Sequence, residues 1–251
     1  MNKDHQIIAL ICCRGGSKGI PKKNIKLFAE KPLLGWTLET AKESKVFDDI
    51  ILSTDSEEIA NVGRDYGATV PGLRPEHLAR DDSDQFDTHS HIFSQLSITD
   101  KTHRVCILVN NPLINVRLIK ESYSKAFSQK FHKIVVDCVP VEDDFVFYRQ
   151  CYESGNGELR FQFPFAMLNS GINRQTIAPT YTSMNNLRWA KPSILSSYQI
   201  YKNEIVNNGF IPVWLPLLRN FELHDEETWR LAEIVFKELL SDDRYLNREK
   251  L

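Results

Sequence analysis

The chain of 251 residues has no large excess of charge of either sign and no long apolar run. Its formal net charge is −2, so it lacks the broad positive field with which general nucleic-acid binders and anionic-membrane binders attract their ligands. No stretch of about 18 apolar residues is present, which argues against a membrane-spanning helix. The N-terminal Met-Asn-Lys-Asp-His does not resemble a signal peptide. We therefore expect a cytoplasmic protein that binds neither nucleic acid nor membrane.

Cysteine is scarce, and its spacing is not that of a metal site. None of the five cysteines forms a CxxC pair, and most lie inside apolar runs, which favours reduced and buried thiols. The adjacent Cys12 and Cys13 admit a redox interpretation, but two small core residues at the end of a strand explain them more simply.

Strand-like and helix-like segments alternate along the first half of the chain. Periodicity predicts strands at 7–12, 49–54, 104–109, 132–139 and 210–215, and helices at 32–42, 86–96, 116–127 and 226–240. Residues 66–70 are typical of the end of a helix followed by a short strand. Ser56 precedes two glutamates and is typical of the residue that caps another helix. Repeated strand–helix units predict an α/β fold with a mainly parallel sheet covered on both faces. Ligands of such sheets bind beyond the carboxyl ends of the strands.

The alternation breaks between residues 140 and 193, where aromatic and polar residues alternate around a glycine-containing turn at 154–157. This pattern predicts an inserted, aromatic-rich arm with a β-hairpin, used as an interface or as core, within one domain spanning 1–251. Two histidines of the helix predicted at 86–96, His89 and His91, are interpreted as surface or capping residues.

The strongest signal for chemistry follows the first strand, in the loop Cys13–Asn24, which reads CRGGSKGIPKKN. Its three glycines allow the backbone N–H groups to approach a ligand, and four cations lie close together in a slightly acidic protein. This combination suits a polyphosphate, because cations and amides neutralise the charge that develops during phosphoryl transfer. Neither the P-loop pattern GxxxxGKS/T nor a clean GxGxxG is present. A solvated basic turn is the alternative interpretation.

Four motifs occur in an order that resembles the CMP-sialic acid synthetase family, which is similar to CMP-Kdo synthetases and other acylneuraminate cytidylyltransferases. They are Arg14–Asn24, Lys31–Leu34, Ile51–Asp55 and Leu73–Ala79. The likeness is dense over residues 7–83, thinner to 127, and returns around 221–233. It implies a Rossmann-like three-layer sandwich with a protruding dimerisation arm, and a homodimer that binds CTP and a divalent cation, Mg²⁺ or Mn²⁺. The anomeric hydroxyl of a 2-keto-3-deoxy sugar acid would attack the α-phosphorus of CTP, and pyrophosphate would leave.

The resemblance also assigns residues by motif. Arg14 and Lys23 would be catalytic, because they would stabilise charge on the α-phosphate and the departing pyrophosphate. The nucleotide would be bound by Gly15, Gly16, Ser17, Lys18, Asn24 and Arg74. The pair Arg174-Gln175 matches a position that meets the sugar acid, and an arginine fork suits a carboxylate.

Three segments depart from the family pattern. The segment 108–114 contains neither of the expected Gln and Arg, although Asn110 and Asn111 keep hydrogen-bonding capacity. Residues 184–189 replace an expected Asn-Gly segment. Where the family has two metal-binding aspartates, this chain has Glu222, His224 and Asp225.

Strand alternation would point Glu222 and His224 the same way, and a histidine ligand favours Mn²⁺ over Mg²⁺. The alternative is that His224 merely flanks a helix and Asp225 caps it. Two further functions stay open from the sequence. One is a nucleotidyltransferase for another nucleotide or acid acceptor, and the other is a non-catalytic nucleotide-binding protein.

Overall fold

The computed structural model describes residues 5–141, 151–153, 159–162, 181–215 and 222–241. Its centre is a six-stranded sheet in the order β10-β6-β9-β5-β1-β4. The strands are β1 (Gln6–Cys12), β4 (Asp49–Ser53), β5 (His103–Leu108), β6 (Val135–Pro140), β9 (Tyr181–Ala190) and β10 (Ile211–Trp214). Two short ribbons accompany it, β2 (Leu27–Phe28) with β3 (Lys31–Pro32), and β7 (Cys151–Glu153) with β8 (Leu159–Phe161).

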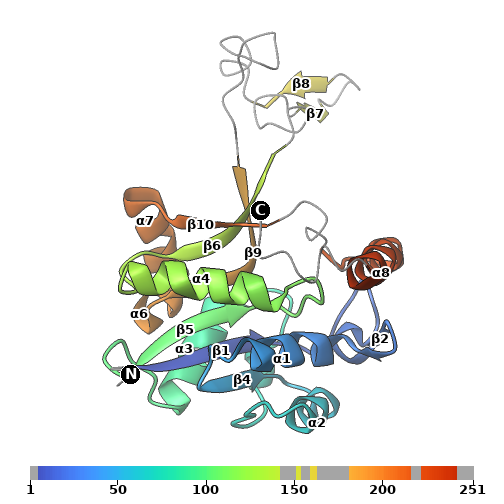
Figure 1. The fold of residues 1–251 in the computed structure, drawn as a ribbon, viewed down its shortest axis with the longest axis horizontal. Helices are drawn as coiled ribbons and strands as arrows, with labels where there is room; N and C mark the ends of the chain where they lie inside the picture. The colour runs from blue at the N-terminus through green and yellow to red at the C-terminus, as the bar shows by residue number, and fades with distance from the viewer. Residues whose placement is uncertain (1–4, 142–150, 154–158, 163–180, 216–221, 242–251) are drawn as a thin grey trace.

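Helices cover both faces of the sheet and form three layers (Figure 1). They are α1 (Leu33–Ser44), α2 (Glu57–Asp65), α3 (Gln85–Gln95), α4 (Val116–Ser128), α6 (Pro192–Leu195), α7 (Tyr198–Asn208) and α8 (Glu226–Ser241), with the 3₁₀ turns η1 (Lys23–Ile25) and η2 (Glu76–Leu78). Alternation along β1 sends Ile7, Ala9 and Ile11 into the core beneath α1, α2 and α4. It sends Ile8 and Leu10 into the core beneath α3, α6 and α7. The predicted three-layer α/β architecture is confirmed.

Short polar side chains begin several of these helices. Ser56 accepts a hydrogen bond from Ile59 N at 3.5 Å, as the sequence predicted, and Asn115 accepts one from Leu118 N at 2.8 Å. Asp84 accepts from Phe86 N at 2.9 Å and begins α3. These caps satisfy N–H groups that the first turn of a helix leaves without a partner.

The strand β9 is the main departure from the expected organisation. Among the described strands of the central sheet it alone runs antiparallel, between β5 and β6. It falls inside the range 140–193, so the expectation that this whole range forms an inserted arm is wrong. The ribbon of β7 and β8 lies beyond the ends of β6 and β9 (Figure 1), and the rest of the predicted hairpin lies outside the described residues.

The histidine His89 is also placed differently from the expectation. Its ring is 1% exposed under α6, and its Nδ1 lies 3.1 Å from Leu195 O. It stacks on Phe93 and meets the edge of Phe86. The surface interpretation was wrong for His89, because α6 and α7 cover a helix face that sequence periodicity alone could not show to be covered.

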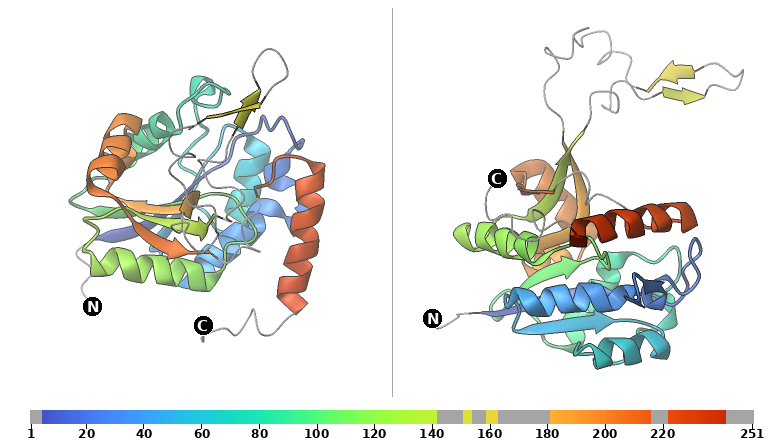
Figure 2. Two further views of the ribbon diagram at one scale, coloured as in Figure 1. Left: turned by 90° about the horizontal axis from the view of Figure 1, so that it is seen from above. Right: turned by 45° about the vertical axis from the view of Figure 1, so that its right-hand side comes forward.

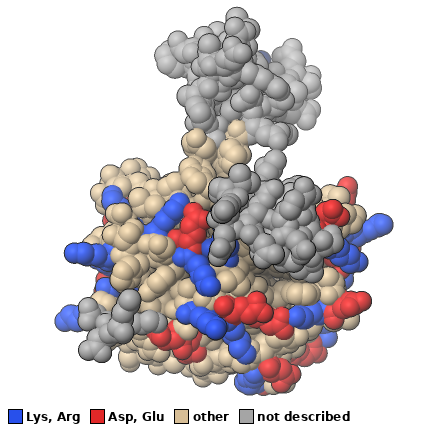
Figure 3. Space-filling model, viewed as in Figure 1, with Lys and Arg blue, Asp and Glu red and all other residues tan. Residues whose placement is uncertain are grey.

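A smaller core seats α8 at one end of the sheet. Phe28 packs edge-on against Trp229 and Phe236 of α8, with ring centroids 5.3 Å apart in both pairs. Ile20, from the loop after β1, is buried in the same cluster. This packing brings the loop after β1 beside the segment that precedes α8 (Figures 1 and 2). Both signs of charge are interspersed on the face shown in Figure 3, as the net charge led us to expect.

Candidate active site

The loop Cys13–Asn24 leaves the carboxyl end of β1 and is fixed at both ends. Cys13 N donates to Ser53 O at 2.9 Å, and Gly15 N donates to Asp55 Oδ1 at 2.9 Å. At the other end, Asn24 Nδ2 donates to Arg14 O at 2.9 Å. The loop is therefore closed on itself rather than disposed as a free basic turn.

The side chain of Asn24 holds the two ends of the loop together. It is 6% exposed, and its Oδ1 accepts from Asn110 Nδ2 at 2.9 Å, while Asn110 Oδ1 accepts from Thr37 Oγ1 at 2.9 Å. The carboxamide of Asn24 thus has a protein partner on both its oxygen and its nitrogen. We assign it the role of holding the loop. Direct contact with a nucleotide, which the resemblance implied, stays a prediction.

Two cations of the loop converge on one carboxylate. Arg14 Nη1 lies 2.6 Å from Asp81 Oδ1, and Lys18 forms an ion pair with the other oxygen of Asp81. Hydrogen bonds from Lys18 and then Arg14 lower the pKa of Asp81 below its usual value. In the chain, Ser17 lies between Arg14 and Lys18, and its backbone N–H donates to Gly15 O at 3.1 Å. The cationic pair therefore already holds an anionic group in this structure.

The two adjacent lysines of the loop lie in different environments. Lys22 pairs with the exposed Glu58, whereas Lys23 is partly buried and donates from Nζ to Leu223 O at 3.1 Å. Burial lowers the pKa of Lys23, and the nearby Cys13 and Glu222 act in the opposite direction. Lys23 is thus the lysine that faces the pocket described below.

Glycine is required at one position of the loop for a structural reason. A Cβ on Gly19 would collide with the carbonyl oxygen of His224, so the loop and the segment before α8 touch at the backbone. A Cβ on Gly16 would meet nothing within 4 Å. Gly16 is therefore open to a ligand, whereas Gly19 allows two chain segments to meet.

The metal-ligand candidates separate into two groups. Glu222 Oε2 and His224 Nε2 lie 2.7 Å apart, so the two side chains meet as expected, although residues 222–224 do not form the strand end from which this was predicted. Asp225 instead accepts from both Thr228 N and Thr228 Oγ1 at 2.8 Å, and these bonds lower the pKa of its carboxyl group. Asp225 therefore caps α8. Within the described part of the chain, no group of three or more His, Cys, Asp and Glu side chains is placed to hold a metal ion.

Arg74 was expected to line the nucleotide pocket. It is 9% exposed and donates to Ser53 O at 2.8 Å and to Ser53 Oγ at 3.2 Å. It is not among the residues that line the pocket described next, and it fixes the segment after β4. The predicted sugar-binding residues Arg174 and Gln175 lie outside the described residues.

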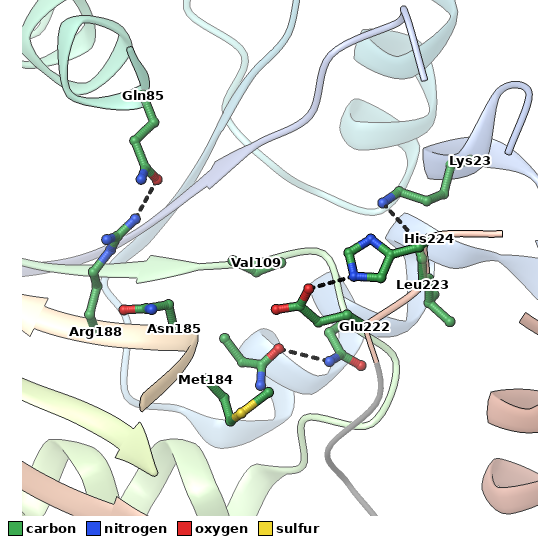
Figure 4. A pocket seen from close by; sticks show the side chains of 11 residues that line it. Lys23, Gln85, Val109, Met184, Asn185, Arg188, Glu222, Leu223 and His224 are labelled. Atoms are coloured by element: carbon green, nitrogen blue, oxygen red, sulfur yellow. Dashed lines mark hydrogen bonds and ion pairs between the residues drawn. The ribbon is translucent and has the colours of Figure 1, made fainter. Parts of the chain in front are cut away.

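A pocket of about 290 Å³ opens where β5 ends beside residues 184–188 in the middle of β9 (Figure 4). It is lined by Lys23, Gln85, Val109, Asn111, Met184, Asn185, Asn186, Arg188, Glu222, Leu223 and His224. Lys23 and the Glu222–His224 pair lie on one side of Val109, and Arg188 with Gln85 lies on the other. The pocket thus joins the loop after β1, the expected metal ligands and the strand β9.

A buried hydrogen-bond network supports the floor of this pocket. Asn111 Nδ2 donates to Asn186 Oδ1 at 2.8 Å, and Asn186 Nδ2 donates to Asp137 Oδ2 at 2.9 Å. Asp137 also accepts from Leu187 N at 3.1 Å, is fully buried, and has a pKa that burial raises. Because each amide is oriented by the next, the network fixes the middle of β9 against the end of β5.

Three residues that line the pocket, Gln85, Asn186 and Arg188, had been assigned no role from the sequence. Asn186 and Arg188 reach the pocket because β9 inserts beside β5, and Gln85 begins α3. One signal was present in the chain, since Asn186 and Arg188 alternate with Leu187 and Trp189 as in a strand with two different faces. Among the described residues, no helix is long and apolar enough to cross a membrane.

Parts of this chain are similar to proteins that are described by an activity. A protein from Campylobacter jejuni described as pseudaminic acid cytidylyltransferase is 38% identical over 122 residues, which are 47% of this chain and 52% of that protein. A Danio rerio N-acylneuraminate cytidylyltransferase A is 50% identical over 86 residues, 34% of this chain and 20% of that protein. The chain thus spans about half the length of the Campylobacter relative that it matches.

Solved structures show the same fold at low identity. A CMP:2-keto-3-deoxy-manno-octonic acid synthetase complexed with CTP superposes with a TM-score of 0.67 at 11% identity, over 93% of this chain and 99% of that chain. A 4-diphosphocytidyl-2C-methyl-D-erythritol synthase from Anaerococcus prevotii gives 0.60 at 14% identity, over 94% and 100%. The family model described as cytidylyltransferase matches residues 8–149, more than half of the chain. This protein belongs to the cytidylyltransferase family.

Proposed function

We propose that the protein transfers CMP from CTP to a 2-keto-3-deoxy sugar acid of the nonulosonate class and releases pyrophosphate. One observation carries the proposal: a closed, cationic, glycine-containing loop and a carboxylate–imidazole pair lie against one pocket. The names of the relatives, which include pseudaminic acid and N-acylneuraminate cytidylyltransferases, support the choice of nucleotide and of acid.

In this reaction Arg14 and Lys18 hold the phosphate oxygens that replace the carboxylate of Asp81, and the open backbone at Gly16 admits the phosphate chain. Lys23 stabilises the charge that develops on the α-phosphate and on the departing pyrophosphate. Its partial burial strengthens that interaction, since a charge is screened less outside bulk water. The sugar hydroxyl releases its proton to solvent as its oxygen bonds the α-phosphorus. The bond from that phosphorus to the pyrophosphate oxygen breaks, and pyrophosphate leaves with the bonding electron pair.

We also propose that Glu222 and His224 hold a divalent cation together with phosphate oxygens of the nucleotide. Their side-chain atoms lie 2.7 Å apart and are 53% and 68% exposed, so they fit a site that substrate completes. One imidazole beside one carboxylate suits Mn²⁺ better than Mg²⁺. When bound, the cation would supply positive charge to the triphosphate. Asp225 is not part of the proposed set, because it caps α8.

A homodimer and a cytoplasmic location complete the proposal. Tyr181 and Trp214 are 55% and 45% exposed, and their rings pack with centroids 4.8 Å apart where the chain leaves the sheet toward β7 and β8. An exposed aromatic pair of this kind is typical of an interface, which supports pairing through the arm. Cys13, Cys106 and Cys138 are free and buried, which supports a reducing compartment.

A pyrophosphate-release assay tests the function directly. CTP, UTP, GTP and ATP would each be offered with N-acetylneuraminic, pseudaminic, legionaminic and 2-keto-3-deoxy-octonic acids. We expect release with CTP and at least one of these acids, and its loss in Arg14→Ala and Lys23→Ala at unchanged melting temperature. Lys22→Ala is the matched control, because Lys22 pairs with Glu58 away from the pocket. Binding of CTP without pyrophosphate release under any condition would identify a non-catalytic nucleotide-binding protein instead.

A further inference from the structure

Arg188 occupies an unusual position for an arginine. It lies within β9 between Leu187 and Trp189, which are both 0% exposed. Arg188 itself is 4% exposed, and it lines the pocket. Burying a guanidinium is costly unless charged or polar groups compensate it. Its surroundings therefore indicate what kind of group the pocket receives.

The protein compensates this guanidinium only in part. An Nη of Arg188 donates to Gln85 Oε1, and the guanidinium lies 5.5 Å from the ring centre of Phe86 and 5.4 Å from that of Tyr201. Its buried Nε has no hydrogen-bond partner, and no Asp or Glu forms an ion pair with it, in the part of the chain that the structure describes. The aromatic rings contact the guanidinium through cation–π interactions.

A second buried arginine offers a useful contrast. Arg74 donates to Ser53 Oγ, Ser53 O and Leu78 O, so backbone and hydroxyl oxygens satisfy it within the protein. Arg74 does not line the pocket, whereas Arg188 does. Arg104 is also buried and has an Nε without a hydrogen-bond partner among the described residues, yet it does not line the pocket. Arg188 is distinguished because its incompletely satisfied guanidinium belongs to a residue that lines the pocket, where a ligand can supply an acceptor.

Gln85 makes this end of the pocket rich in donors. Its amide oxygen is taken by Arg188, so its NH₂ group is left to point toward a ligand. Gln85 is also the first residue of α3, where the helix dipole favours negative charge. Lys23 lies on the other side of Val109 (Figure 4), so cations stand on both sides of one pocket.

We propose that Arg188, together with Gln85, forms a subsite that binds a planar substrate group with two adjacent acceptor atoms. The proposal rests on the function proposed above, in which two groups have this chemistry. They are the carboxylate of the sugar acid and the O2/N3 edge of cytosine. An arginine fork donates to both atoms of such a group at once, which makes Arg188 a determinant of substrate choice.

The test compares Arg188→Met, Arg188→Lys and Gln85→Glu. Methionine keeps an unbranched apolar side chain against Phe86 and Tyr201. Glutamate at the exposed position 85 gives Arg188 an internal carboxylate that competes with the ligand. Gln199→Glu is the matched control, because it adds the same charge at an exposed position in the first turn of α7. Calorimetry measures the Kd for CTP, and pyrophosphate release measures the KM for the sugar acid.

We expect Arg188→Met and Gln85→Glu to raise one of these two constants about ten- to a hundredfold, with Arg188→Lys intermediate and Gln199→Glu unchanged. A raised KM for the acid with unchanged Kd for CTP identifies the carboxylate as the ligand. A raised Kd for CTP identifies the base. Both constants within twofold of wild type, or an equal effect of Gln199→Glu, would overturn the proposal.

Two features keep this result separate from failure of the proposed function. If Arg188→Met does not fold, Gln85→Glu decides alone, since its side chain is exposed. If the wild-type protein releases no pyrophosphate with any acid, the proposed function fails, while CTP calorimetry on the same variants still reports on the base. With no turnover and no change in CTP binding, the subsite proposal fails as well.

Discussion

Arg14 and Asp81 form an ion pair of 2.6 Å across the mouth of the loop after β1, and Lys18 joins them from the same loop. The carboxylate of Asp81 is therefore paired with both cations that the family resemblance expects to bind phosphate. A triphosphate bound by Arg14 and Lys18 would compete with Asp81 for these cations. This relationship makes nucleotide affinity depend on a residue that need not touch the nucleotide.

We predict that Asp81→Asn tightens CTP binding by up to about fivefold, because the internal competitor loses its charge. Calorimetry at low salt measures the change, and it should shrink as salt screens exposed charges. Asp82→Asn removes the same charge at the next position and should leave affinity unchanged. Weaker binding in Asp81→Asn would instead show that Asp81 takes part in holding the ligand.

The contact between Gly19 and the carbonyl of His224 predicts opposite outcomes for two glycines of one loop. Gly19→Ala should cost about 1–3 kcal/mol of unfolding free energy, because a methyl group would force two backbone segments apart. Gly16→Ala should stay within about 0.5 kcal/mol of wild type, since open space surrounds it. Urea unfolding of the two variants side by side provides the check, and equal stability would contradict the close contact.

The amide pair Asn24–Asn110 should be energetically coupled. Either alanine variant leaves buried polar atoms without partners and should cost about 1–3 kcal/mol. The double variant should cost less than the sum, with a coupling of at least about 0.5 kcal/mol. Asn207→Ala, at an exposed position on α7, serves as the control for the substitution itself. Strict additivity would show that the loop is not held through this pair.

Buried His89 predicts loss of stability in acid. Burial lowers its pKa to about 3, whereas an unfolded histidine titrates near 6.5. Between these values the unfolded chain binds a proton that the folded protein does not, so stability falls as pH falls. The slope from this residue is at most about 1.4 kcal/mol per pH unit. Urea unfolding from pH 7 to 4 should give a shallower profile for His89→Gln than for wild type, and identical profiles would refute the assignment.

Removal and replacement of the divalent cation should distinguish the proposed metal ligands before α8 from the residue that caps this helix. EDTA should abolish pyrophosphate release, and added Mn²⁺ should restore it at lower concentration than Mg²⁺. Glu222→Gln and His224→Ala should raise the metal concentration required for half-maximal activity. Asp225→Ala should leave that concentration unchanged and lower stability by about 1 kcal/mol, because its cap is lost. A metal requirement shifted by Asp225→Ala alone would reverse these roles.

Local signals in the chain predicted much of the fold. The apolar run 7–12 and the cap at Ser56 mark β1 and α2, because strand alternation and helix capping involve near neighbours only. The cationic glycine-containing loop was recognisable for the same reason. In contrast, β9 was predicted as part of the arm. The sequence of residues 181–190 does not show that this strand will pair between β5 and β6 in the central sheet.

Some features of the candidate site could likewise be predicted from the sequence, and others could not. The sequence by itself determined the composition of the loop Cys13–Asn24 and the family. Only the tertiary structure decided that Asp81 occupies the loop's cations, that Asp225 caps a helix, and that Arg188 enters the pocket. The contacts of Asp81 and Arg188 join residues far apart in the chain, and their partners are set by which strands pair and which helices cover them. Charge and hydrogen bonding act over a few ångströms in space, whatever the separation along the sequence.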